Sequence, residues 1–444
     1  MKTNILSIAR NAAVAALFIS PVLLSAQDRN WTNMRAYDQS GINVFEAPKD
    51  TLTEFDGLKV KFGAGFTQSF QGLKHENSAN NLYKISPGFN TANANLFMDV
   101  QLADGIRLNL TSYLSSRHHN ETWVKGGYIQ FDKLPFNGKI WDDIMKITTI
   151  KIGHTEINYG DQHFRRSDGG QTLQNPFVEN YIMDAFATEI GGEVYVRQGN
   201  AFGMLGVSNG LIKGNIDSVT AGRDAQGNIV DDNLHKSPSI YGKIGYDAQV
   251  DENVRIRVAG SFYHNNSAGN NGNTLYGGDR TGSNYFMVME QAMVNGAAPT
   301  YASAAFSGRF NPGFTKKIDA FQFNGFVKTY GLEVFGTYEI AKGRTKTEVD
   351  SRDAKQFAIE GVYRFGQKEN VFIGARYNTV TAEIAGSPAD VKIDRASFAA
   401  GWFLTRNVLL KGEYVNQKYK DFAVTDYRNG GKFNGYVIQA VVGF

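Results

Sequence analysis

The sequence contains no cysteine and only 9 prolines among 444 residues. The absence of cysteine excludes disulfide bonds, thiolate metal ligands and thiol nucleophiles. After residue 26, no apolar run reaches the roughly 20 residues that a transmembrane helix needs. No proline-rich or serine-rich linker and no shift in composition divides the chain, so we expect a single domain. A hydrophobic content of 42% excludes an intrinsically disordered chain.

The N-terminus predicts an export signal covering residues 1–26. Two basic residues precede an apolar run from Ala12 to Leu24, and Ser25-Ala26 supplies small residues for cleavage. An exported chain without disulfides must take its stability from its fold.

Alternating apolar and polar residues dominate the chain from residue 57 to its end. In one segment, Val254, Ile256 and Val258 alternate with Arg255 and Arg257. This period of two is typical of strands with one apolar face and one polar face. Short turns and long polar stretches alternate between the segments. This order indicates an antiparallel up-and-down sheet with one trimmed rim and one rim of loops.

This parity predicts sixteen strands. Residues 133–145 are longer than the short turn expected there and residues 284–290 look strand-like, so eighteen strands are the alternative. The predicted strands lie near residues 57–70, 92–103, 105–115, 122–132, 146–155, 187–198, 200–208, 238–248, 253–264, 319–329, 331–341, 355–365, 370–379, 391–404, 407–417 and 433–444. An even number of such strands, closed on itself, describes an all-β transmembrane barrel, because lipid cannot satisfy the amides of an open edge. The alternative is a soluble sandwich or solenoid, whose buried strands would not carry arginines so regularly opposite an apolar face. We expect the barrel at 57–444 and a loosely ordered periplasmic segment at 27–56.

The chain ends in GYVIQAVVGF, which places Tyr436, Ile438, Ala440 and Val442 on one face together with the terminal Phe444. This pattern resembles the closing strand of bacterial outer-membrane proteins, whose terminal aromatic residue is read by the barrel assembly machinery. The resemblance implies that Phe444 is an assembly signal. It also implies a Gram-negative outer membrane, with lipid and lipopolysaccharide as surroundings.

A second resemblance covers about residues 150–210. The stretch IKIGHTEINYGDQHFRRSDGG, then NPFVENYIMD and GGEVYVRQGNAFGMLGVSNG, resembles the arrangement in phosphate-selective and related anion porins of the O/P type. The resemblance implies a sixteen-stranded diffusion channel, often trimeric, for small anionic or neutral solutes. The sequence departs from that family because it lacks a run of closely spaced lumen arginines, which leaves phosphate specificity open.

The stretch YGDQHFRRSDGG lies in a long loop, 156–187, after the fifth predicted strand. Its candidate selectivity residues are Asp161, His163, Arg165, Arg166 and Asp168. In sixteen-stranded porins the corresponding loop folds inward and narrows the channel, so these charges would set the field at a constriction. Two alternatives are a solvated external loop and a chemical site. Ser167 and His163 are close in sequence, but Ser167 does not lie in a Gly-x-Ser-x-Gly motif, so we predict no catalytic residues.

The predicted lumen face carries more basic than acidic residues when the apolar residues face lipid. Fourteen basic and eight acidic residues take such positions, although the net charge of the whole chain is only +3. The basic set includes Arg107, Arg197, Lys243, Arg255, Arg257, Arg364, Arg376, Arg395 and Lys411. This excess predicts a bore that favours anions. A nonselective pore of mixed charge is the alternative.

The sequence therefore predicts a passive porin with a mild anion preference, and not an enzyme. The alternative function is a non-conducting adhesin or structural barrel that acts through its extracellular loops, above all 265–318. No cofactor, metal or nucleic-acid partner is expected. His118 and His119 would make a poor chelate, because adjacent side chains on a strand point in opposite directions.

Overall fold

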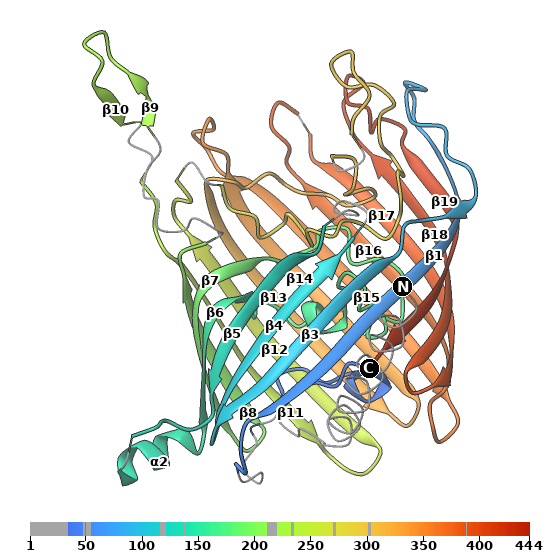
Figure 1. The fold of residues 1–444 in the computed structure, drawn as a ribbon. Helices are drawn as coiled ribbons and strands as arrows, with labels where there is room; N and C mark the ends of the chain where they lie inside the picture. Colours follow the sequence, from blue (N-terminus) through green and yellow to red (C-terminus); the bar gives the residue numbers. More distant parts are fainter. Residues whose placement is uncertain are drawn as a thin grey trace, which may run out of the picture.

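The computed structural model describes residues 34–444 except 48, 50–54, 116–120, 137, 211–219, 232–234, 270–271, 301–302 and 388. The predicted export signal and the His118-His119 pair lie outside the described residues. Sixteen antiparallel strands form a closed barrel, with a two-residue strand β2 (Gly88–Phe89) attached to its wall (Figure 1). This confirms the predicted fold class and the count of sixteen.

Each barrel strand pairs with its neighbours along the chain, and the barrel closes where β1 pairs with β19. The strands are β1 (Lys59–Glu76), β3 (Asn93–Ala103), β4 (Ile106–Leu114), β5 (Trp123–Phe131), β6 (Thr148–Glu156), β7 (Thr188–Gln198), β8 (Ala201–Ser208), β11 (Ser239–Gln249), β12 (Val254–Asn265), β13 (Lys317–Thr329), β14 (Leu332–Arg344), β15 (Arg352–Phe365), β16 (Val371–Ala382), β17 (Val391–Thr405), β18 (Val408–Lys420) and β19 (Lys432–Gly443). A small hairpin, β9 (Thr220–Arg223) and β10 (Ile229–Asp231), projects beyond the rim that carries the long loops (Figure 1).

Residues 133–145 did not fit a short turn because they contain a helix, α2 (Lys139–Met145), at the rim of short turns (Figure 1). Residues 284–290 form no strand. Two short 3-10 helices complete the described elements, η1 (Gln39–Gly41) and η3 (Gln162–Arg165). Among the described residues, no helix has the length and apolar character needed to cross a membrane.

The barrel wall has the two faces that the alternation predicts. On β12, Val258 is 52% exposed on the outside, whereas its neighbour Arg257 is 0% exposed. On β13, Phe321, Phe323 and Val327 also face outward. Exposing these apolar side chains to water would cost about 25 cal/mol per Å² of apolar surface, so the outer surface suits lipid.

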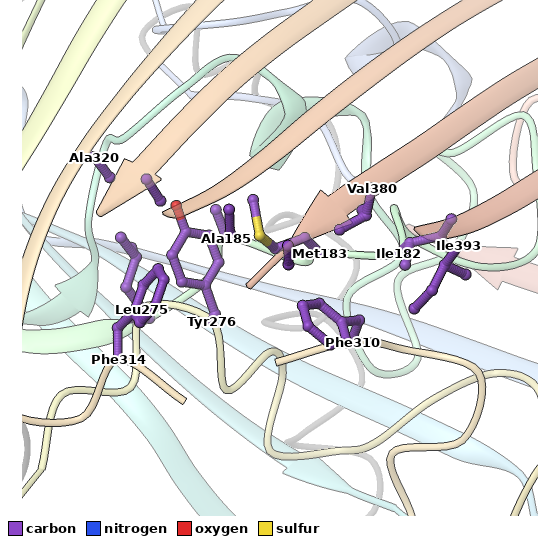
Figure 2. Packing of buried hydrophobic residues seen from close by; sticks show 14 of the residues in the cluster. Ile182, Met183, Ala185, Leu275, Tyr276, Phe310, Phe314, Ala320, Val380 and Ile393 are labelled. Carbon is purple, nitrogen blue, oxygen red and sulfur yellow. The ribbon is translucent and has the colours of Figure 1, made fainter. Parts of the chain in front are cut away.

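Two long connections fill one side of the barrel interior. We call residues 157–187, between β6 and β7, the inward loop, and residues 266–316, between β12 and β13, the long loop. Ile182 and Met183 of the inward loop belong to a buried apolar cluster with Phe310 of the long loop. Val380 and Ile393 contribute to the same cluster from the wall (Figure 2). Both loops are therefore anchored inside the barrel by apolar packing.

A third segment, residues 34–47, also lies inside the barrel, and we call it the N-terminal segment. Phe45 packs in a buried cluster with Phe326 and Phe335 of the wall. The ring of Tyr37 stacks on Phe97 with 4.0 Å between the ring centroids. The structure thus differs from the expected loosely ordered periplasmic segment, because these side chains find partners in the barrel interior.

Candidate functional site

The candidate site is the inward loop together with the wall that it faces. The chain reverses direction at Gly160 and Gly169, which have positive φ values of 71° and 57°. Residues other than glycine rarely adopt this backbone conformation. A Cβ atom on Gly160 would also meet the side chain of Gln322 at 1.8 Å. The glycines therefore permit the loop to turn inside a confined space.

Asp161 attaches the inward loop to β11 and β12. Its carboxylate accepts hydrogen bonds from Arg257 Nε at 2.7 Å and from Lys243 Nζ at 2.9 Å. Burial favours the neutral carboxyl, but attraction to Lys243 and Arg257 outweighs burial and lowers the pKa of Asp161. Asp161 is therefore ionised and neutralises part of the wall charge.

Arg165 reaches β14 and β15 of the wall and joins an ion-pair network there. Its Nε lies 2.9 Å from Glu360, and its Nη1 lies 3.4 Å from Glu333. The wall arginines Arg364 and Arg376 pair with the same two carboxylates, at 2.7 and 2.8 Å. All five groups are buried. Arg165 therefore holds the loop against the wall.

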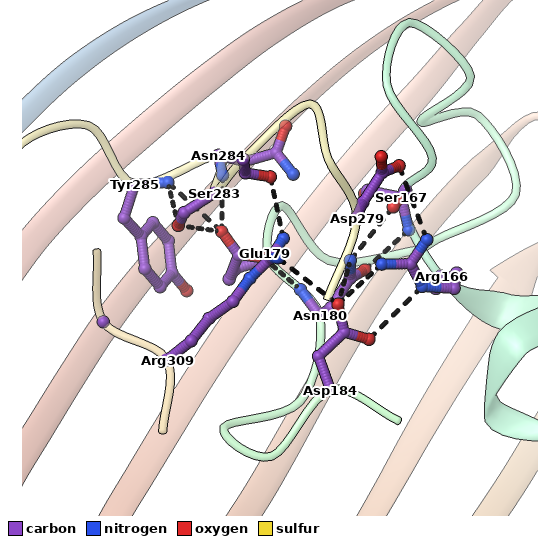
Figure 3. Close-up of polar contacts among 12 residues, drawn as sticks. Arg166, Ser167, Glu179, Asn180, Asp184, Asp279, Ser283, Asn284, Tyr285 and Arg309 are labelled. Carbon is purple, nitrogen blue, oxygen red and sulfur yellow. Dashed lines mark hydrogen bonds and ion pairs between the residues drawn. The ribbon is translucent and has the colours of Figure 1, made fainter. Parts of the chain in front are cut away.

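Arg166 and Asp168 belong to a second network, near the rim of long loops. Arg166 Nη2 donates to Asp184 at 2.6 Å, and its Nη1 lies 3.6 Å from Asp279 of the long loop (Figure 3). Lys125 of β5 contacts both Asp168 and Asp279, the latter at 3.0 Å. Burial raises the pKa of Asp168 to about 7, with Lys125 opposing this change and Asp279 adding to it. The ionisation of Asp168 is therefore sensitive to pH near neutrality.

His163 lies between Glu156 and Asn158. Its Nδ1 is 2.6 Å from Glu156 Oε1, and its Nε2 is 2.8 Å from Asn158 Oδ1. Burial lowers the pKa of His163, although Glu156 acts against this change. His163 therefore ties the end of β6 to the start of the inward loop.

A buried carboxylate, Glu179, joins the inward loop to the long loop. It accepts hydrogen bonds from Ser283 Oγ and from the backbone NH groups of Asn284 and Asn180, the last at 2.8 Å (Figure 3). Arg309 Nη2 lies 3.2 Å from it. The sequence analysis missed Glu179, as it missed Asp184, Asp279 and Glu46. Isolated acids in polar stretches carry no periodic signal.

A cavity of about 600 Å³ lies inside the barrel beside the wall from β3 to β8. At the rim of short turns its lining includes Lys146 and Gly199, and near the other rim it includes Lys125 and Thr188. The N-terminal segment and the inward loop form its inner side. His163 and Asp168 line this cavity, whereas Asp161, Arg165 and Arg166 are not among its lining residues.

The nine predicted lumen arginines and lysines all lie on the barrel strands, but most are neutralised or satisfied. Carboxylates pair with Lys243, Arg255, Arg257, Arg364 and Arg376. Backbone carbonyls of the loops accept hydrogen bonds from Arg395 and Lys411. Arg107 and Arg197 line the cavity. Asp161 and Glu46 neutralise Lys243 and Arg257 from outside the wall, whereas Arg255, Arg364 and Arg376 pair with carboxylates of the wall itself.

Phe444 lies where the barrel closes. Its backbone NH donates to Ala64 O at 3.0 Å, and Ala64 N donates to its carbonyl at 2.8 Å. Its side chain is 54% exposed. No group of His, Asp or Glu side chains suited to a metal ion occurs in the described ranges of the chain.

No family model matches the chain, and no curated protein sequence matches it. Solved structures of outer-membrane proteins do resemble it. The anion-selective porin from Comamonas acidovorans superposes with a TM-score of 0.51 at 9% identity, covering 87% of this chain and 100% of that one. A loop L8 deletion mutant of OmpT, an outer membrane protein of Vibrio cholerae, gives 0.49 at 11% identity, covering 88% and 100%. The outer membrane channel DcaP of Acinetobacter baumannii gives 0.48 at 10% identity, covering 88% and 99%. The likeness to the Comamonas porin shows a shared barrel fold and nothing finer.

Proposed function

We propose that the chain is an outer-membrane channel for the passive diffusion of small hydrophilic solutes, with a mild anion preference. The observation that carries the proposal is the cavity beside β3–β8, which extends from the rim of short turns nearly to the rim of long loops. In an outer-membrane barrel these rims face the periplasm and the outside, respectively. The inward loop and the N-terminal segment narrow the path between them.

The charges that line the cavity support the anion preference. Glu46, Glu156 and Asp168 each lie beside a basic or histidine side chain. Arg107 and Arg197 form no salt bridge within the described part of the chain, although Asp99 lies near Arg107. The path therefore keeps a positive surplus, which favours anions. Phosphate is one anion to test, because the resemblance of residues 150–210 to phosphate-selective porins suggests it.

Single-channel conductance of the refolded protein in a planar bilayer, under a threefold KCl gradient, tests the proposal. We expect stable current steps and a reversal potential that favours chloride. A protein that is demonstrably folded and inserted but passes no current would contradict channel function. A reversal potential near zero would contradict only the anion preference and favour a nonselective pore.

The alternative of an adhesin depends on displayed loops, and the structure gives it less support. Leu275, Tyr285, Val288 and Phe310 of the long loop are buried. We also propose no catalytic role, because Ser167 Oγ donates to Val178 O at 2.9 Å while His163 binds Glu156 and Asn158. The homotrimer implied by the porin resemblance stays a prediction, which the native mass in detergent tests.

A further inference from the structure

The cavity contains a buried hydrogen-bond donor that nothing satisfies. Arg107 of β4 is 5% exposed, and its Nη2 donates to Gln130 Oε1 at 2.7 Å. Its Nε has no hydrogen-bond partner among the residues that the structure describes. An unsatisfied buried donor costs about 1–3 kcal/mol, and more when it is charged. Because Arg107 lines the cavity, a bound acceptor would remove this cost.

The strand register places a second cation near Arg107. Arg107 is paired with Gln130 on β5, and Gln130 is paired with Lys151 on β6. Neighbouring strands lie about 4.8 Å apart, so the Cα atoms of Arg107 and Lys151 are separated by roughly 10 Å. Glu193, the cross-strand neighbour of Lys151, already accepts hydrogen bonds from Tyr195, Tyr241 and the backbone of Asn158. The two cations therefore lie on the same face of the wall, with the buried side chain of Gln130 between them, and one anion could contact both.

Aromatic rings lie beside Lys151 and beside Arg197, a third basic residue of the cavity lining. The ammonium group of Lys151 lies 5.0 Å from the ring centroid of Tyr128 and 5.1 Å from that of Tyr195. The guanidinium of Arg197 lies 5.6 Å from the ring centroid of Phe202. These three rings line the same cavity. A ligand with a planar apolar body suits this wall, whereas inorganic phosphate would lose hydration against it.

Carboxylates in the cavity limit the charge of a ligand. Asp99 accepts hydrogen bonds from Tyr37 Oη at 2.9 Å and from Asn109 Nδ2 at 2.7 Å. Glu46 and Glu156 lie further along the lining. A multiply charged anion would be repelled by these groups, so a monoanion is favoured. The volume of about 600 Å³ is within the range of roughly 300–1,000 Å³ found for small-molecule sites.

We propose that this part of the cavity binds small aromatic monocarboxylates, with the carboxylate between Arg107 and Lys151 and the ring against Tyr128, Tyr195 and Phe202. The inference deepens the proposed function by naming a solute class, and it rests on that function only for the route by which the solute arrives. Binding itself requires only the folded barrel.

Isothermal titration calorimetry of the refolded protein in detergent tests the site with four probes: benzoate, neutral benzamide, acetate and inorganic phosphate. We expect saturable benzoate binding that is at least about tenfold tighter than binding of the other three. Arg107→Gln and Lys151→Gln should each weaken benzoate binding by about tenfold or more, because a hydrogen bond to a charged group contributes about 1.5–3 kcal/mol. Heat-modifiable electrophoretic mobility checks that each variant is folded.

Lys328→Gln is the matched control, because it removes a lysine of β13 that pairs with Glu369 and does not line the cavity. It should change benzoate affinity by less than about twofold. The inference is overturned if the folded protein binds no benzoate, if acetate or benzamide binds as tightly, or if the control weakens binding as much as Arg107→Gln. Conductance without benzoate binding would remove this inference alone, whereas benzoate binding without conductance would remove the proposed channel and keep the site.

Discussion

Asp168 is the residue of the inward loop whose charge can change near neutral pH. It lies at the end of the cavity near the long loops, beside Lys125, Asp279 and Arg166. Burial raises its pKa to about 7, from an ordinary value of 3.8. Between about pH 4 and pH 7, Asp168 therefore keeps its proton in the folded protein, whereas the unfolded chain has already released it. This group stabilises the fold most at low pH, and its contribution declines as pH rises through about 7.

Lowering the pH from 8 to 6 should increase the anion preference of the channel. Protonation of Asp168 removes one negative charge from the path, while Lys125 and Arg166 keep their positive charges. The reversal potential under a KCl gradient, measured at several pH values, checks this. Asp168→Asn should show the low-pH selectivity at every pH, and Asp426→Asn in a distant loop should behave like the parent. A parent protein whose selectivity is constant from pH 6 to 8 would contradict the prediction.

The sequence could predict which residues face the lumen but not which partners they meet. Arg257 and Val258 alternate because wall residues face either the interior or lipid, and this rule needs no tertiary information. Besides its cross-strand neighbour Asp247, the partners of Arg257 are Asp161 and Glu46, which lie far from it in the chain. Their position depends on how two irregular segments fold inside the closed barrel. The carboxylates that reach Arg257 from outside the wall could therefore not be predicted from the sequence.

At the scale of elements, the inward loop is held by ion pairs with the wall, and its release should widen the path. Arg165→Met keeps an unbranched side chain, shorter than arginine, and removes the pairs with Glu333 and Glu360. Breaking such a buried pair costs about 3–5 kcal/mol, so the loop should leave its position part of the time. We expect larger and noisier current steps in single-channel recordings.

Arg352→Met is the control for this experiment. It breaks a pair with Glu348 near the rim of long loops, away from the cavity. Its current steps should match those of the parent. If Arg165→Met gives the same conductance and noise as Arg352→Met, the inward loop does not limit the path.

The N-terminal segment should act as a second restriction. Arg35, Tyr37, Phe45 and Glu46 line the cavity, and Lys243 and Arg257 help to lower the pKa of Glu46 to about 2 despite its burial. Deletion of residues 34–47 should therefore raise the conductance. After the deletion, Asp161 still pairs with both Lys243 and Arg257, so the barrel should still fold.

Replacement of the hairpin Thr220–Asp231 by a short Gly-Ser turn provides the comparison for this deletion. The hairpin projects beyond the rim, so its removal should leave the conductance unchanged (Figure 1). Equal conductance of the two variants would show that the N-terminal segment does not restrict the path. The sequence could not place this segment, because it has neither a period of two nor a helical period.

At the scale of the whole molecule, the fold depends on one closing pair of strands. The register between β1 and β19 runs from Gly65 opposite Gly443 to Glu76 opposite Lys432. This closure joins segments that are far apart in sequence, and it leaves no edge for lipid to meet. The strand count and the alternating faces were predictable because every strand repeats the same pattern. The filling of the interior was not, since it depends on contacts that exist only after closure.

Phe444 should matter for assembly more than for stability. Its outward side chain belongs to no buried apolar cluster of the described residues, and its backbone bonds with Ala64 do not need the ring. Phe444→Ala should therefore change the free energy of unfolding by only about 0.5 kcal/mol, as is usual for surface positions. If the terminal ring is an assembly signal, the same variant should nevertheless lower the amount of folded protein in the outer membrane.

Phe321→Ala, at a lipid-facing ring that is 51% exposed, is the matched control and should assemble normally. Heat-modifiable mobility in outer-membrane fractions measures both variants, and equal folded amounts would show that the ring of Phe444 is not read during assembly.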